Sequence, residues 1–205
     1  MRYTPSPDVR AGPDSEWCAD VLPKVSRTFA LTVDLLEEPM EKHIRLGYLL
    51  CRIADTIEDA GHVPPHEQVR LLETYDAALD PDDVTSIDDF RAAVDPWLPT
   101  ADDRDPDWDV VAEAPTVIAT YAELPADVRA AIQPPVREMV GGMATTIDRY
   151  AAEGGLRLQT GPELLGYCHY VAGTVGVLIT NLLTHTDVPD RHTSAMEESA
   201  EAFAM

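Results

Sequence analysis

Tyr48-Leu-Leu-Cys-Arg-Ile-Ala-Asp-Thr-Ile-Glu-Asp59 is the segment that constrains the structure of this chain most strongly. At about 100° of rotation per helical residue, its polar side chains fall within roughly 60° of one another. These side chains are Tyr48, Arg52, Asp55 and Asp59. The apolar side chains gather on the opposite face: Leu46, Leu50, Ile53 and Ile57. The pattern predicts an amphipathic helix over residues 40–60, begun by Pro39 and stopped by Gly61.

The acidic face of this predicted helix can bind a metal ion. Asp55 and Asp59 lie one turn apart, so their carboxylates can share a hard cation through oxygen. Magnesium usually keeps part of its water and binds one or two carboxylates together with substrate phosphates. Arg52, one turn before Asp55, can contact a diphosphate oxygen. The other interpretation is a solvated helix face with a surface ion pair, and the spacing alone does not separate the two.

The rest of the chain also has helical patterns, and no stretch alternates apolar and polar residues as strands do. Residues 1–14 have no periodicity and are expected to be a flexible lead-in, while the Asp- and Pro-rich stretch 80–109 is expected to be irregular, with short helical pieces near 87–94. The fold class predicted is all-α. The further helices expected are at 16–36 (interrupted near Pro23 and Ser26), 65–79, 107–122, 125–153, 161–184 and from 193 onward.

The charge balance excludes some partners. The chain has 37 Asp and Glu against 15 Lys and Arg, a formal net charge of −22. Such a field repels nucleic acid, so no nucleic-acid partner is expected, and it disfavours anionic membrane surfaces. Disorder does not explain the acidity, because apolar periodicity runs through most of the chain. An acidic tail does not either, because the acids are spread along the sequence. The composition is typical of proteins from salt-loving (halophilic) microbes.

Cysteine usage and hydropathy indicate where the protein works. Cys18, Cys51 and Cys168 are far apart and form no CxxC pair, which argues against zinc and against a disulfide framework. Cys51 and Cys168 lie in apolar runs and are expected in the core. No 18-residue apolar stretch and no signal-peptide pattern is found, so a cytoplasmic location is expected. Contact with a membrane is expected only to collect or release apolar molecules.

Several segments elsewhere in the chain, taken with the acidic helix, resemble the squalene and phytoene synthase family from about residue 16 to the end. Pro106-Asp107-Trp108 and Ala114-Pro115-Thr116-Val117 look more like the squalene branch than the phytoene branch. The other matching segments are Ser26-Arg27-Thr28-Phe29, Met139-Val-Gly-Gly-Met143 and Tyr167-Cys-His-Tyr-Val-Ala-Gly-Thr-Val-Gly176. The resemblance implies a single-domain isoprenoid synthase-type helical bundle around a central cavity.

The resemblance also implies roles for individual residues. Asp55 and Asp59, supported by Glu58, would hold Mg2+ against the diphosphate of farnesyl diphosphate. Tyr48 and Tyr167 would lie near the ionising diphosphate and the carbocation. The substrate-binding residues implied are Ser26, Arg27 and Arg52 for diphosphate oxygens, and Phe29, Val171 and Val175 for the isoprenoid pocket. The other interpretation of the tyrosine segment is a core helix with a seam of small residues and hydrogen-bonded tyrosines.

The reaction implied is the head-to-head condensation of two farnesyl diphosphates, followed in squalene synthases by reduction with NADPH. A carbocation survives only in a dry apolar cavity, and aromatic faces stabilise positive charge. Alternatives are a phytoene or dehydrosqualene synthase, or a non-catalytic module or split subunit that binds prenyl diphosphates.

The sequence departs from the family pattern near its end. The family has a second acidic helix of the D-x-x-E-D kind, whereas the acids after Gly176 do not form that motif; they are Asp187, Asp190, Glu197, Glu198 and Glu201. Residues 15–205 are therefore expected to be the N-terminal two-thirds of the domain, missing its C-terminal helices. A complementary C-terminal chain is the partner expected, and the chain alone is expected to have little or no synthase activity.

Overall fold

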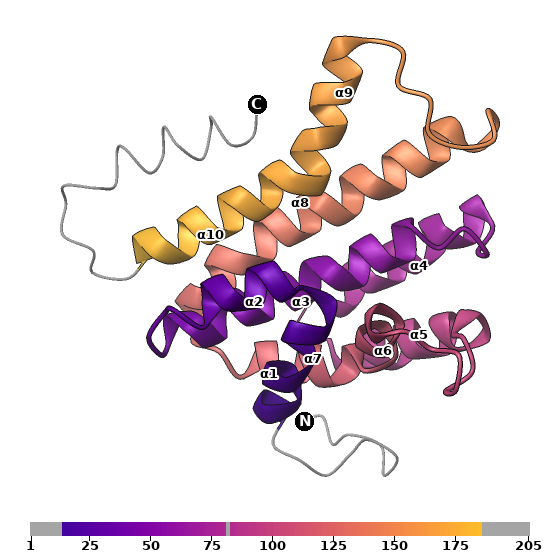
Figure 1. The fold of residues 1–205 in the computed structure, drawn as a ribbon. Coiled ribbons are helices and arrows are strands. Elements are labelled where there is room, and N and C mark those ends of the chain that lie inside the picture. The colour runs from indigo at the N-terminus through magenta and orange to yellow at the C-terminus, as the bar shows by residue number, and fades with distance from the viewer. Residues whose placement is uncertain (1–13, 81–82, 186–205) are drawn as a thin grey trace.

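The computed structural model describes residues 14–80 and 83–185, and every regular element in these ranges is helical (Figure 1). The all-α prediction is confirmed. In chain order the elements are α1 (Asp14–Val25), α2 (Arg27–Val33), α3 (Met40–Glu58), α4 (Pro65–Ala78), α5 (Val84–Val94), the 3₁₀ turn η1 (Asp95–Trp97), α6 (Pro106–Ala112), α7 (Ala114–Ala122), α8 (Ala126–Ala151), α9 (Gly161–Cys168), the π-helical turn η2 (His169–Gly173) and α10 (Thr174–His185).

Most predicted boundaries lie close to the observed ones, with local differences. The break near Ser26 is present, because the Ser26 side chain accepts a hydrogen bond from the backbone N–H of Phe29 and starts α2. The predicted helix 107–122 is divided at Glu113 into α6 and α7. Asp14 already belongs to α1, while the rest of the expected lead-in and the helix predicted from residue 193 lie outside the described residues.

The stretch 80–109 is more regular than its composition suggests. It contains α5, whose first turn is capped by the Asp83 carboxylate, which accepts a hydrogen bond from Thr85 N–H. Phe90 and Val94 are buried, and the Phe90 ring lies 5.2 Å from that of Tyr75 in α4. Burial of these apolar side chains stabilises α5 although the surrounding sequence is acidic.

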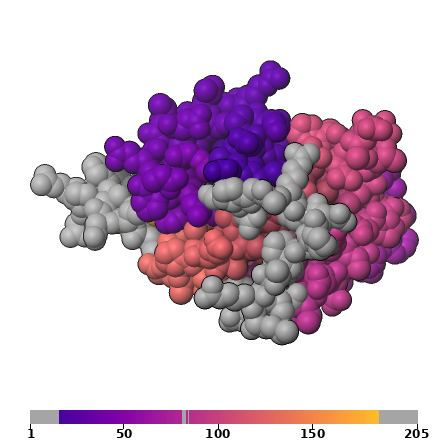
Figure 2. Space-filling model, turned by 90° about the horizontal axis from the view of Figure 1, so that it is seen from below, coloured from indigo at the N-terminus to yellow at the C-terminus, as the bar shows by residue number. Residues whose placement is uncertain are grey.

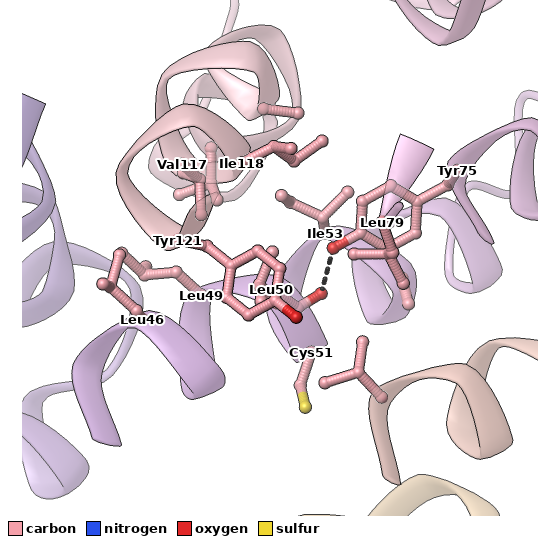
Figure 3. Packing of buried hydrophobic residues seen from close by; sticks show 14 of the residues in the cluster. Leu46, Leu49, Leu50, Cys51, Ile53, Tyr75, Leu79, Val117, Ile118 and Tyr121 are labelled. Atoms are coloured by element: carbon pink, nitrogen blue, oxygen red, sulfur yellow. Dashed lines mark hydrogen bonds between the residues drawn. The ribbon is translucent and has the colours of Figure 1, made fainter. Parts of the chain in front are cut away.

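Helix α3 lies at the centre of the bundle, where it contacts α1, α2, α4, α6, α7, α8 and α10. The face predicted to be apolar is buried: Leu46, Leu50, Ile53 and Ile57 are at most 1% exposed. Figure 3 shows Leu46, Leu50 and Ile53 beside residues of α4 and α7. The Tyr75 hydroxyl donates a hydrogen bond of 2.8 Å to the Leu50 carbonyl. Burial raises the pKa of Cys51 to about 12, so this cysteine is a core thiol, as predicted.

Helices α8, α9 and α10 form the other side of the bundle. α8 packs against α4, α3 and α10. The turn η2 joins α9 to α10, and α9 runs at a steep angle to α10, away from the bundle (Figure 1). Figure 2 shows a different face, which α1–α3 share with part of α8 and with the segment around residues 84–115. The expectation that Cys168 is a core residue is wrong, because α9 projects from the bundle and leaves this side chain exposed. No helix within residues 14–80 and 83–185 combines the length and apolar character needed to cross a bilayer.

Gly142 in α8 lets the turn η2 approach closely. A Cβ atom at this position would lie 2.2 Å from Cγ of Tyr170, whereas a Cβ at Gly141 would meet nothing within 4 Å. We therefore expect Gly142→Ala to lower the free energy of unfolding by about 2 kcal/mol through overpacking. Gly141→Ala, one residue away on the exposed side of the same helix, is expected to raise it by about 0.5–1 kcal/mol. Urea denaturation of both variants checks this, and equal effects would contradict the close packing.

Candidate active site at the acidic end of α3

The Arg52 guanidinium connects the polar side chains of α3. Its Nη1 donates a hydrogen bond of 2.7 Å to Oδ2 of Asp55, and its Nη2 donates to the Tyr48 hydroxyl. The Tyr48 ring is stacked on Phe29 of α2 at 4.3 Å between centroids. The predicted face is therefore a connected polar network with an aromatic pair at one end.

Asp107 of α6 joins this network, although sequence reasoning gave it no role. Its Oδ1 lies 3.7 Å from Nε of Arg52, and neither atom has a hydrogen-bond partner within the described residues. The Asp105 carboxylate caps α6 by accepting a hydrogen bond from Trp108 N–H, which sets the first turn that carries Asp107. The signal in the sequence was the Pro-Asp-Trp segment, which by itself does not reveal a contact with Arg52.

The last turn of α3 is held by Gln68 of α4, a buried residue. Its side-chain amide donates hydrogen bonds to the carbonyls of Ile57 (2.9 Å) and Glu58 (2.6 Å). These carbonyls belong to the last turn of the helix, where the regular donors four residues further on are missing. Gln68 therefore positions the segment that carries Glu58 and Asp59, and no sequence pattern indicated this role.

Tyr167 of α9 meets the same helix end. Its hydroxyl is hydrogen-bonded to the Glu58 carboxylate. Burial raises the pKa of Tyr167 well above its ordinary value, and the negative charge of Glu58 adds to the shift. Burial also raises the pKa of Glu58 to about 7; Tyr167 opposes the shift, whereas Asp59 and Asp55 add to it. Glu58 is thus a carboxyl group expected to titrate near pH 7.

The pKa of Asp55 is raised as well. Burial raises its pKa, the Arg52 guanidinium opposes this effect, and repulsion from Asp59 and Asp107 adds to it. The pKa of Asp107 is raised as well, again mainly by burial. The negative charge of Asp55, Glu58, Asp59 and Asp107 is concentrated here and is not neutralised by one arginine, which favours a bound cation.

Two adjoining hollows lie beside this charge. The first, of about 220 Å³, is lined by Glu58, Asp59, Pro65, Gln68, Thr146, Ile147, Tyr150, Ala151, Gly155, Leu156 and Tyr167. The second, of about 350 Å³, shares three of these residues with it, namely Thr146, Tyr150 and Tyr167. Although Asp59 is exposed, it borders the same hollow as Tyr167, so the end of α3 faces α9.

The carboxylates are of the kind that bind magnesium together with phosphate oxygens. No three His, Cys, Asp or Glu side chains within the described ranges lie close enough to hold a metal ion by themselves. Magnesium needs no such cage, because it is usually bound by one or two carboxylates, water and substrate phosphates. Burial is the main cause of the raised pKa values of Asp55 and Glu58, and repulsion from neighbouring carboxylates, which a divalent cation would relieve, adds to it.

The remaining predicted site residues lie outside these hollows. Ser26 caps α2, and Arg27 beside it is exposed. Val171 and Val175 are half-buried and pack against the apolar core. Their roles in binding diphosphate or an isoprenoid chain stay predictions. Tyr150, which lines both hollows, was not predicted, since nothing in its local sequence distinguishes it from a core tyrosine.

Known proteins are similar in sequence to most of this chain. The family model described as Squalene/phytoene synthase matches residues 22–205. The squalene synthase of Eremothecium gossypii is 29% identical over 182 residues, covering 87% of this chain and 38% of the relative. The presqualene diphosphate synthase of Botryococcus braunii is 25% identical over 180 residues, covering 88% and 40%. The chain therefore spans about two-fifths of the length of these curated relatives.

The fold is also that of solved structures. A complex of TcSQS with the ligand BPH1237 superposes with a TM-score of 0.73 at 24% identity, covering 94% of this chain and 51% of that one. This likeness supports the isoprenoid synthase-type helical fold. Since the family model extends over most of the sequence, the chain belongs to the squalene/phytoene synthase family.

Proposed function

We propose that this chain carries the diphosphate-ionising part of a squalene synthase-type prenyltransferase that acts on farnesyl diphosphate. The observation that carries the proposal is the acidic end of α3, where Glu58 and Asp59 border one hollow with Tyr167. The relatives named squalene synthase and presqualene diphosphate synthase support the substrate class. The overall reaction proposed is head-to-head condensation of two farnesyl diphosphates to presqualene diphosphate, followed by reduction with NADPH to squalene. The described residues offer no feature that we assign to NADPH.

Each residue of the site has a chemical task in this proposal. Asp55 and Asp59, with Glu58, would hold magnesium against the substrate diphosphate. Bound magnesium would neutralise the charge that grows on the diphosphate as its bond to the allylic carbon breaks. Arg52, held by Tyr48 and Asp55, would add a fixed positive charge on the same face. The aromatic side chains of Tyr48 and Tyr167 would stabilise the resulting allylic cation.

The proposed function is tested by binding and by product analysis. Calorimetry should detect binding of a non-ionising farnesyl diphosphate analogue in the presence of MgCl2, and no binding after EDTA treatment. Binding that is independent of metal would overturn the proposal. Incubation with farnesyl or geranylgeranyl diphosphate, with and without NADPH, separates a squalene-forming activity from a phytoene- or dehydrosqualene-forming one by mass spectrometry of the hydrocarbons.

Glu58 provides a pH-dependent test of the site. Because its pKa is about 7 in the fold, against an ordinary 4.5, its protonated form stabilises the fold at low pH. This contribution is expected to be lost as the pH rises from about 4.5 to 7. Carboxyl ¹³C NMR should show one glutamate titrating near pH 7, and this signal should be absent in Glu58→Gln.

Two further conditions sharpen the assignment of that signal. Tyr167→Phe should raise the midpoint, because the Tyr167 hydrogen bond lowers the pKa of Glu58, and millimolar MgCl2 should lower it. Glu73→Gln, on the exposed side of α4, is the control and should leave the titration unchanged. A Glu58 signal that titrates near 4.5 would show that this carboxylate is not buried against Tyr167.

A further inference from the structure

Tyr150, near the end of α8, has a polar group that the fold itself does not use. The residue is only 5% exposed, and its hydroxyl has no hydrogen-bond partner within the described residues. A buried hydroxyl without a partner costs free energy, since it gives up its hydrogen bonds to water. Such groups are rare in folded proteins, so each one calls for an explanation.

The surroundings of Tyr150 hold its ring in place beside the acidic end of α3. The Arg149 guanidinium lies 5.2 Å from the centre of the ring. Arg149 is itself held by an ion pair of 2.6 Å with Glu163, which forms the capping box at the start of α9. The Tyr150 ring is therefore covered by a guanidinium that α9 holds in place, while its hydroxyl has no partner among the described residues.

Tyr150 is also shared by both hollows, together with Thr146 and Tyr167. The Thr146 hydroxyl already donates to the Gly142 carbonyl, and the Tyr167 hydroxyl is bonded to Glu58. Of the three hydroxyl-bearing side chains that border both hollows, Tyr150 is thus the one whose hydroxyl has no hydrogen-bond partner among the described residues. A donor withdrawn from water beside a hollow forms stronger hydrogen bonds than an exposed one.

We propose that the Tyr150 hydroxyl donates a hydrogen bond to an oxygen of the diphosphate that the Glu58–Asp59 end of α3 receives together with magnesium. The inference rests on the proposed function and adds a binding residue to it. Diphosphate oxygens are strong, charged acceptors, and a phenol is a neutral donor that does not compete with the carboxylates for the metal. The hydroxyl has no partner among the described residues until the ligand binds. The free-energy cost of burying it unpaired is therefore offset only in the complex.

The test compares the wild-type chain with Tyr150→Phe, which removes the hydroxyl and keeps the ring beside Arg149. The probe is inorganic pyrophosphate with MgCl2, measured by calorimetry, together with the melting temperature of the ligand-free protein. We expect the ligand-free Tm to be unchanged or higher, because no hydrogen bond is lost. The affinity for magnesium pyrophosphate should fall about tenfold, as for loss of a hydrogen bond to a charged group.

A structural tyrosine serves as the matched control. Tyr75 is fully buried, and its hydroxyl donates to the Leu50 carbonyl, so Tyr75→Phe should lower the Tm and leave the pyrophosphate affinity unchanged. Equal affinity of wild type and Tyr150→Phe overturns this inference and leaves the proposed function standing. A lower ligand-free Tm for Tyr150→Phe also overturns it, because the hydroxyl would then be paired in the fold. Absence of any magnesium-dependent binding by the wild type overturns both.

Discussion

Asp55→Asn is expected to reduce the magnesium-dependent affinity for diphosphate about 100-fold or more, the size of effect typical for a lost metal ligand or its support. Asp55 is the carboxylate that combines burial, a direct bond to Arg52 and repulsion from Asp59. Asparagine keeps the shape of the side chain but removes the charge that attracts magnesium. Calorimetric titration of inorganic pyrophosphate in the presence of MgCl2 measures the loss.

The same substitution is expected to leave the ligand-free protein at least as stable as the wild type. The pKa of Asp55 is raised in the fold, so ionising this group at neutral pH opposes folding, and a neutral asparagine removes that penalty. Arg52 keeps its contacts with Tyr48 and Asp107. A gain or constancy in Tm together with a large loss of binding is the signature of a functional carboxylate.

Glu73→Gln is the matched control for Asp55→Asn, because it removes one negative charge from an exposed position on α4. Its effect on diphosphate affinity should be within experimental error. If both variants bound magnesium pyrophosphate equally well, the assignment of Asp55 would be wrong. If Asp55→Asn unfolded the chain at ordinary temperature, the carboxylate would instead have a structural role.

Salt is expected to have the second large effect, on folding itself. We propose that the acidic surface is an adaptation to high salt, and that the Tm rises by more than about 10 °C between 0.1 and 2 M KCl. The screening length falls from about 10 Å at 0.1 M to about 3 Å at 1 M, so repulsion between neighbouring surface carboxylates is largely removed. Calorimetric scans over a series of KCl concentrations measure this.

The structure supports repulsion as the cause. The acids within 84–109 that lie on the surface are exposed and close together in the chain: Asp88, Asp89, Asp95, Asp102, Asp103, Asp105 and Asp109. Replacing Asp88, Asp89, Asp102 and Asp103 by Asn should therefore raise the Tm at 0.1 M KCl and flatten its dependence on salt. A Tm that is independent of KCl would contradict the proposal.

Helical periodicity was sufficient to predict the face of α3 that carries the site. Residues three and four apart share a side of a helix whatever surrounds it, so Arg52 and Asp55 were expected together and are hydrogen-bonded at 2.7 Å. The same rule predicted which side would be buried, and Ile53 and Ile57 are fully enclosed. The family resemblance rested on motifs of this local kind, and the family model bears it out.

Local patterns failed where the outcome depended on packing between distant helices. Cys168 lies in an apolar run, yet it is exposed because α9 leaves the bundle beyond the turn η2. The helix α5 forms within an acidic stretch because Phe90 packs on Tyr75. In both cases the outcome depends on residues of different helices, which the helical period of 3.6 residues does not relate to one another.

The amino-acid sequence alone thus determined the all-α class, the family and the paired carboxylates of α3, because each depends on spacing along one helix or on short motifs. Only the tertiary structure decided that Asp107 approaches Arg52 and that Gln68 holds the last turn of α3. It also decided that Tyr150, whose hydroxyl has no partner among the described residues, borders the same hollow as Asp59. These relations join different helices, and the angles and distances between helices follow from how the whole core packs.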